Sequence, residues 1–231
     1  MEPSASSRAP QTIEIPVLPK SAGSFRAHPW HGLSIGDKAP TVVTAYIEIV
    51  PSDTVKFEME RNTGLLIVDR PQKYSNVLPS MYGLIPQTYC GDRLAKHAGA
   101  ERGDGEALDV CVLSQRPISH GDFVTPVIPI GGLSIIDKGE ADDKIIGYMA
   151  QEELYHQWKT LSDAPPSVVE RLQHYFLTYK TPPGWKTTSV LRKTYQKDEA
   201  LEVIHLAMLD YADLIKSHSH AASGGIARPK L

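Results

Sequence analysis

The pattern that most limits the fold lies between Thr41 and Ala150, where short apolar runs alternate with turn residues. Turns such as Asn62-Thr-Gly64 and His120-Gly-Asp122 separate some of these runs. The predicted strands are Val42 to Val50, Val55 to Met59, Leu65 to Val68, Leu108 to Leu113, Phe123 to Ile130, Leu133 to Ile136 and Ile145 to Met149. Several short strands of this kind favour a small closed or nearly closed β-barrel.

Helices are expected only after these strands. Pro165 and Pro166 begin the first, and Pro182-Pro-Gly184 ends it. Its apolar side chains recur at helical spacing: Val168, Val169, Leu172, Phe176 and Tyr179. A second helix is expected from about Asp198 to Ser217. This segregation predicts an α+β fold, a small OB-like β-barrel with C-terminal helices packed on it.

Length and composition predict one folded domain. A chain of 231 residues with 41% hydrophobic content can bury a single core. Residues 1–27 are rich in Ser, Ala and Pro and are expected to form a flexible N-terminal arm, with an organelle transit peptide as the alternative. The domain is predicted to span residues 28–217, and residues 218–231, which are poor in apolar side chains, to form a disordered tail.

Charge and cysteine content limit the possible partners and the cellular compartment. With 24 basic and 27 acidic side chains the net charge is −3, which disfavours a nucleic-acid binder with a broad basic face. No apolar run approaches the roughly 18 residues of a membrane helix. Cys90 and Cys111 are expected to be buried, reduced thiols. We therefore expect a cytoplasmic protein that binds neither nucleic acid nor membrane.

The chemistry concentrates in acidic segments. Asp104, Glu106 and Asp109 fall within six residues that run into an apolar strand, and a second acidic stretch covers residues 137–144. Clustered carboxylates repel one another unless cations lie among them, so hard-metal ligation is indicated. From the residues alone, a solvated acidic loop and a structural calcium site remain alternatives.

Two further strands carry polar side chains of interest. In Val55-Lys-Phe-Glu-Met59 the strand alternation puts Lys56 and Glu58 on one polar face. Glu48 is an acid inside the apolar Ile47-Glu-Ile49. An exposed strand face is the alternative reading for Glu48.

These residues also carry a family resemblance, because seven blocks occur in a characteristic order. The blocks are Ile47-Glu48-Ile49, Lys56-Phe-Glu58, Val68-Asp69-Arg70, Tyr82-Gly83, Asp104 to Asp109, Asp137 with Asp142 and Lys144, and Tyr179-Lys180. Over roughly residues 42 to 180 the chain resembles soluble family I inorganic pyrophosphatases. The segment from Tyr89 to Gly103 and the His28-Pro-Trp-His31-Gly entry resemble most a bacterial subgroup that includes chlamydial enzymes.

The resemblance implies a reaction and a set of roles. The expected reaction is hydrolysis of inorganic diphosphate to two orthophosphates by a hydroxide that Mg²⁺ activates. The implied metal ligands are Asp104, Asp109, Asp137 and Asp142, with Glu48 near the outer metals. The implied substrate contacts are Lys56, Arg70, Tyr82, Lys144, Tyr179 and Lys180, with Glu58 in support.

Three positions depart from the family pattern. Glu106 stands where the family has the aspartate that handles the attacking water, and its extra methylene moves the carboxylate by about 1.5 Å unless the loop retracts. Ala107 replaces a usual proline, which gives that loop room to adjust. Leu78 stands where many relatives have a tyrosine near the phosphate site, so one hydrogen bond is lost.

Glu106 therefore keeps a rival reading open, in which the same fold hydrolyses diphosphate weakly or prefers another phosphoanhydride. A third reading is a noncatalytic OB-like module that binds nucleic acid or a partner, but this needs aromatic and basic residues on a sheet face, and only 7% of residues are aromatic. A homo-oligomer is expected from the family, without a predicted size.

Overall fold

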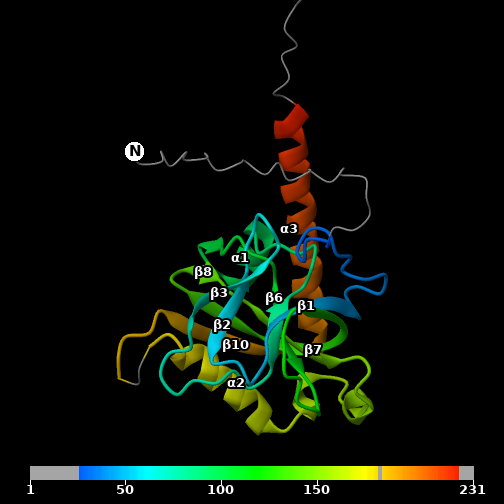
Figure 1. Ribbon diagram of the computed structural model, residues 1–231. Helices are drawn as coiled ribbons and strands as arrows, with labels where there is room; N and C mark the ends of the chain where they lie inside the picture. Colours follow the sequence, from blue (N-terminus) through cyan, green and yellow to red (C-terminus); the bar gives the residue numbers. More distant parts are fainter. Residues whose placement is uncertain (1–25, 182–183, 224–231) are drawn as a thin grey trace, which may run out of the picture.

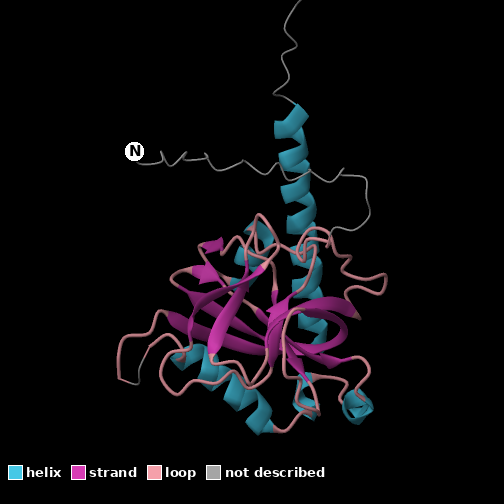
Figure 2. Ribbon diagram, viewed as in Figure 1, coloured by secondary structure: helices cyan, strands magenta, loops and turns pink. Residues whose placement is uncertain are grey.

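The structure is a computed structural model that describes residues 26–181 and 184–223 (Figure 1). Five strands follow one another around a ring: β1 (Val43–Ile49), β4 (Met81–Leu84), β6 (Asp109–Leu113), β9 (Lys144–Met149) and β7 (Phe123–Asp137), which pairs back onto β1. Neighbours are antiparallel except β6 and β9, which are parallel. The predicted OB-like α+β fold is confirmed, as the strands and helices of Figure 2 show.

Strand β7 corrects one prediction. The sequence predicted two strands, separated at Gly131 and Gly132, whereas the structure has one strand of 15 residues. Its second half pairs with β10 (Ser189–Gln196). A Cβ atom on Gly131 would lie 2.5 Å from the carbonyl oxygen of Tyr195. The glycines therefore permit close approach of β10 and do not end the strand.

Strands β2 (Val55–Met59) and β3 (Leu66–Pro71) form a separate hairpin that lies across the barrel in Figure 1. The two-residue strands β8 (Glu140–Ala141) and β5 (Arg102–Gly103) extend the main sheet beyond β7. The 3₁₀ helices η1 (Glu153–Gln157) and η2 (Leu161–Asp163) precede the second α-helix.

Helix α2 (Pro166–Thr178) begins at the predicted proline and ends before residue 182, which lies outside the described residues. Helix α3 (Lys197–Ser223) runs past its predicted end at Ser217 and projects from the barrel (Figure 1). Ser217 Oγ donates to the carbonyl of Leu214 at 2.7 Å, and His218 Nδ1 lies 2.8 Å from the same oxygen. Residues 218–223 of the predicted disordered tail are thus helical, while residues 1–25 and 224–231 lie outside the described part.

The segment from Tyr89 to Gly103 contains a helix that the sequence did not predict, α1 (Asp92–Ala98). It packs against α3, where Arg93 Nη1 donates to Asp210 Oδ1 at 2.9 Å. The ring of His97 lies 3.1 Å from a carboxylate oxygen of Glu199. This segment is therefore a structural element that joins the barrel to the C-terminal helix.

The apolar core lies on both sides of the sheet. One cluster joins the strands to α1 and α3 and includes Ile47, Leu108 and Ile204. A second joins them to α2 and includes Leu133 and Leu172. Full burial of each such side chain stabilises the fold by about 1.5–3 kcal/mol. The predicted burial of Cys90 and Cys111 as free thiols is confirmed, and Leu78, 2% exposed, belongs to this core.

Across residues 26–181 and 184–223 we find no helix whose length and apolar character would suit it to cross a bilayer.

Candidate active site

One cavity collects nearly all of the predicted site residues. It has a volume of about 390 Å³ and lies between the barrel and the β2–β3 hairpin. Twelve of the thirteen predicted residues line it: Glu48, Lys56, Glu58, Tyr82, Asp104, Glu106, Asp109, Asp137, Asp142, Lys144, Tyr179 and Lys180. The predicted residue that does not line it is Arg70.

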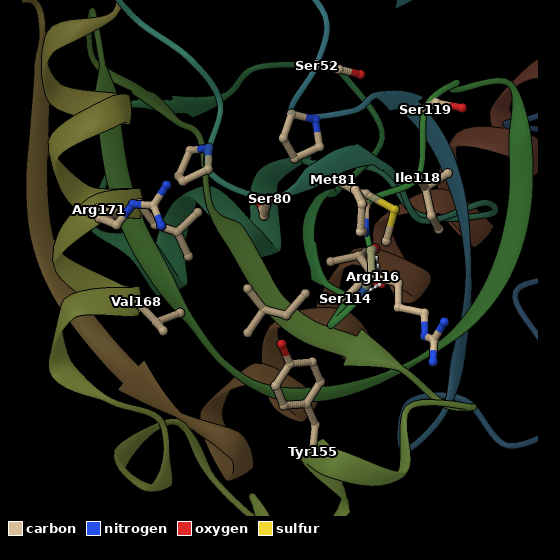
Figure 3. Close-up of a pocket in the computed structure, with 16 residues that line it drawn as sticks. Ser52, Ser80, Met81, Ser114, Arg116, Ile118, Ser119, Tyr155, Val168 and Arg171 are labelled. Atoms are coloured by element: carbon tan, nitrogen blue, oxygen red, sulfur yellow. Dashed lines mark hydrogen bonds between the residues drawn. The ribbon is translucent and has the colours of Figure 1, made fainter.

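A second cavity of about 350 Å³ lies beside α2 (Figure 3). Its wall is largely apolar, with Met81, Ile118 and Val168 among the lining residues. In Figure 3 the hydroxyl of Tyr155 points into the cavity from η1, and Arg171 extends toward it from α2. None of the predicted site residues lines this cavity, so the chemistry belongs to the first.

Strand pairing places Lys144 beside the acids. Asp109 and Lys144 are register partners at the start of the parallel strands β6 and β9. The Lys144 ammonium pairs with Asp109 Oδ2 and Asp142 Oδ1, although the residue is only 2% exposed. Burial lowers the pKa of Lys144, but the two carboxylates outweigh that effect and hold the pKa well above its usual value. This ammonium is therefore charged at neutral pH.

Three carboxylates in the cavity, those of Glu48, Asp104 and Asp109, are destabilised in their charged form, since burial raises the pKa of each. Burial, together with the charges of Asp142 and Asp109, raises the pKa of Asp104 to about 8. Burial likewise raises the pKa of Glu48 to about 8, even though Glu48 Oε1 accepts the N–H of Met59 at 2.8 Å. Glu48 is 7% exposed, so its alternative reading as an exposed strand residue is wrong. Positive charge is needed nearby for these groups to ionise at neutral pH.

Asp137 is already paired with a cation. Its Oδ2 accepts from Lys180 Nζ at 2.6 Å, and its Oδ1 accepts from the hydroxyls of Thr188 and Ser189 at 2.7 and 3.0 Å. Burial raises the pKa of Asp137, but these hydrogen bonds and the Lys180 charge lower it below its usual value overall. Asp137 is thus ionised at neutral pH.

The hairpin supplies a chain of alternating charges. Lys56 pairs with Glu58, which the strand alternation placed on the same face, and its Nζ lies 3.1 Å from Asp69 Oδ2. The same Asp69 oxygen pairs with Arg70. Arg70 is therefore linked through Asp69 to Lys56, which lines the cavity.

Aromatic rings flank the lysines. Lys144 Nζ lies 5.7 Å from the ring centroid of Tyr82 and 5.6 Å from that of Phe176. Lys180 Nζ lies 5.2 Å from the ring of Tyr179. These cation–π contacts hold the ammonium groups at the cavity wall without neutralising them.

Glu106 is placed by contacts on two sides. Its backbone N–H donates to Asp104 Oδ1 at 2.9 Å, and its carboxylate pairs with Arg61. Sequence reasoning missed Arg61, which lines the cavity from the β2–β3 turn. The available signal was its place in the turn between β2, which carries Lys56 and Glu58, and β3.

The donor set suits a hard divalent cation, because it consists of carboxylate oxygens whose charges repel one another. Within the described ranges no three His, Cys, Asp or Glu side chains are arranged to enclose an ion. The ammonium of Lys144 stands between Asp109 and Asp142 and supplies positive charge there. By donor chemistry the site fits a metal, and Lys144 is the group that would have to share these carboxylates with it.

An OB-like barrel with desolvated carboxylates and lysines facing one polar cavity has the groups that a phosphohydrolase using divalent metal needs. Comparison with known proteins identifies the family of this chain. The family model for inorganic pyrophosphatase matches residues 45–212. The chain therefore belongs to the inorganic pyrophosphatase family, and it hydrolyses inorganic diphosphate.

Individual relatives agree with this assignment. An inorganic pyrophosphatase of Chlamydia muridarum is 46% identical over 198 residues, which cover 81% of this chain and 95% of the relative. One from Chlamydia caviae is 45% identical over 195 residues, covering 80% and 90%. The crystal structure of the Thermus thermophilus inorganic pyrophosphatase is 29% identical, with a TM-score of 0.69 and coverage of 81% and 99%. The predicted likeness to chlamydial members is confirmed.

Proposed function

We propose that the divalent metal is Mg²⁺ and that Asp104, Asp109 and Asp142 hold it, with Asp137 and Glu48 beside them. The observation that carries this proposal is that Asp104, Asp109 and Asp142 line one cavity, where burial and the neighbouring carboxylates raise the pKa of Asp104. Such a group needs a permanent cation in order to serve as a charged ligand at neutral pH. Mg²⁺ takes few carboxylates, keeps several waters and accepts phosphate oxygens as further ligands.

The lysines serve the substrate in this proposal. Lys56, Lys144 and Lys180 face the cavity and bind the phosphoryl oxygens of diphosphate, with Tyr82 and Tyr179 beside them. Each lysine is now paired with a carboxylate, so entry of the substrate exchanges these partners for phosphate oxygens. Arg70 acts through Asp69, and Glu58 orients Lys56.

Glu106 orients the attacking water and accepts its proton. The bound metal supplies Lewis-acid activation of the water and neutralises charge on the phosphates. The chain's own contribution is a carboxylate at the cavity mouth, held by Asp104 on the backbone side and by Arg61 on the side-chain side.

The experiment that tests this function is phosphate release from diphosphate across a Mg²⁺ titration, compared with release from ATP. We expect release from diphosphate that depends on Mg²⁺, and little release from ATP. A preference for ATP, or equal rates without divalent metal, would contradict the proposal and would favour the reading in which Glu106 redirects the site to another phosphoanhydride.

Assembly and nucleic-acid binding stay predictions. We propose a homo-oligomer that does not bind nucleic acid, and the acidic lining of the cavity supports the second part, because it repels a polyanion where the metal is absent. Light scattering of the purified chain and a filter-binding assay with DNA and RNA test the two statements separately.

A further inference from the structure

We propose that Arg61 is a positioning residue: it fixes the carboxylate of Glu106 at the cavity mouth and so compensates for the methylene that glutamate has in excess of aspartate. The inference rests on the proposed role of Glu106. It assigns a function to the turn between β2 and β3, which carries none of the predicted site residues. The contact that motivates it is the ion pair between Arg61 Nη2 and Glu106 Oε1.

The turn that carries Arg61 is closed by hydrogen bonds to Glu60. The carboxylate of Glu60 accepts the backbone N–H groups of Asn62 and Thr63 at 3.0 and 2.8 Å. It also accepts from the Asn62 amide at 2.9 Å and from the Thr63 hydroxyl at 2.7 Å. Four hydrogen bonds to one carboxylate close the turn, so the backbone of Arg61 is fixed although it lies at the surface.

The turn is also fastened to the barrel. His28 Nε2 lies 3.0 Å from the carbonyl oxygen of Arg61. Gly64 has φ of +70°, and a Cβ atom there would lie 2.6 Å from Pro29 Cδ. Trp30 is 4% exposed, and its Nε1 donates to the carbonyl of Thr88 at 2.7 Å. Residues 28–30 therefore anchor the base of Arg61 to the barrel core.

The backbone of Glu106 is also held by the fold, so the position of its carboxylate depends on the side-chain torsions. The carbonyl of Glu106 accepts the N–H of Cys90 at 2.8 Å, and Ala107 is 5% exposed in the core. A glutamate has three side-chain torsions against two for aspartate, so an unrestrained carboxylate would be spread over more positions. A fixed guanidinium that binds Oε1 selects one of these positions and leaves Oε2 for the water.

The first test is kinetic and compares Arg61→Gln with Arg61→Lys and with a matched control, Arg102→Gln. Arg102 pairs at 2.8 Å with Glu140, which lines the same cavity, and this pair has side-chain exposures of 60% and 33%, against 57% and 37% for Arg61 and Glu106. We expect kcat at saturating Mg²⁺ and diphosphate to fall about tenfold or more in Arg61→Gln, with KM within twofold. Arg61→Lys should restore part of the loss, and Arg102→Gln should match the wild type.

Two kinetic outcomes would overturn the proposal. A raised KM with unchanged kcat would mean that Arg61 contacts the substrate directly. An equal loss when Arg61→Gln is added to Glu106→Gln would mean that Arg61 acts independently of Glu106, because a positioning residue has no further effect once its target is lost.

The second test needs no catalysis. In the metal-free protein, carbodiimide-driven coupling of an amine to Glu106 is followed by peptide mass spectrometry. We expect Arg61→Gln to label severalfold faster than the wild type and than Arg102→Gln, because the ion pair shields the carboxylate. Equal labelling rates would overturn the contact. This result is independent of diphosphate hydrolysis, so failure of the proposed function and failure of the Arg61 proposal can be told apart.

Discussion

Asp109 and Lys144 face each other across the parallel strands β6 and β9, and their side chains form an ion pair. Parallel pairing of these two short strands brings together residues from two separate acidic segments of the chain. Asp142 joins the same ammonium two residues before β9. The electrostatic balance of the cavity therefore depends on strand register: a slip of one residue would turn Lys144 to the other face of the sheet.

The first prediction concerns Asp109 as a metal ligand. Asp109→Asn removes one ligand charge, so the Mg²⁺ concentration for half-maximal activity should rise by at least about tenfold. Loss of a residue that only supports a metal ligand already lowers metal affinity by about 10- to 100-fold, and loss of the ligand itself should cost no less. A Mg²⁺ titration of diphosphate hydrolysis measures this. Asp37→Asn, at an exposed residue outside the cavity, serves as the control and should leave the titration unchanged. A wild-type titration for Asp109→Asn would contradict the ligand assignment.

The second prediction concerns Lys144 as a buried counter-ion. In the metal-free protein Lys144→Met leaves two carboxylates without their shared cation, so the free energy of unfolding should fall by about 3 kcal/mol. Added Mg²⁺ should stabilise the variant more than it stabilises the wild type, because it replaces the missing charge. Urea denaturation with and without Mg²⁺ measures both effects. Equal stabilisation of the two proteins would show that the metal binds elsewhere.

Local patterns predicted the parts of the fold that local forces decide. The β2 strand follows the apolar alternation of Val55 to Met59, and α2 begins at Pro166 as its proline indicated. Strand β4 escaped notice because Gly83 in its middle weakens the strand pattern, and α1 because seven residues are too few to show a helical period. Strand β10 escaped because long-range pairing with β7 holds residues such as Lys193 in a strand despite their polarity.

The site residues divide in the same way, into those that local sequence motifs predicted and those that only long-range contacts reveal. Strand and loop motifs predicted the acids and lysines because these recur in fixed order along the chain. The partnership of Arg61 with Glu106 was not predictable from spacing, because it requires the turn of one hairpin to meet a loop beyond α1. Likewise Arg70 was predicted as a substrate contact, whereas the structure pairs it with Asp69 and leaves it outside the cavity lining.

The third prediction tests whether Arg70 influences the substrate through its ion pair with Asp69. Arg70→Lys keeps the charge but loses the planar fork that binds Asp69, so kcat/KM for diphosphate should fall while the Mg²⁺ requirement stays constant. Arg116→Lys, at the second cavity, is the control. If kcat/KM for Arg70→Lys equals that of the wild type, Arg70 is a structural partner of Asp69 and has no influence on the substrate.

The fourth prediction concerns pH and the β2–β3 turn. The backbone N–H of Asn62, then the hydroxyl and N–H of Thr63, lower the pKa of Glu60 from 4.5 to about 2. A depressed carboxylate pKa stabilises the folded state above the unfolded value, and this contribution is lost as pH falls from about 4.5 toward 2. In Glu60→Gln the side-chain NH₂ group faces some of the N–H and O–H donors that now bind the carboxylate. The substitution should therefore lower the melting temperature at pH 7 and have a smaller effect at pH 3. A pH-independent difference would show that the carboxylate charge does not hold the turn.

The last prediction returns to the departure at Glu106. If the site were built for aspartate and merely tolerated glutamate, Glu106→Asp would raise kcat at saturating Mg²⁺. The Arg61 contact indicates instead that the site is adapted to glutamate, because the shorter side chain of aspartate no longer reaches the guanidinium of Arg61. We therefore expect Glu106→Asp to lower kcat, and Glu106→Gln to be more severely impaired, because an amide cannot accept the proton of the water. Adding Arg61→Gln to Glu106→Asp should then cost little, since the pair is already broken. A rise in kcat for Glu106→Asp would show that glutamate is a handicap that the turn does not offset.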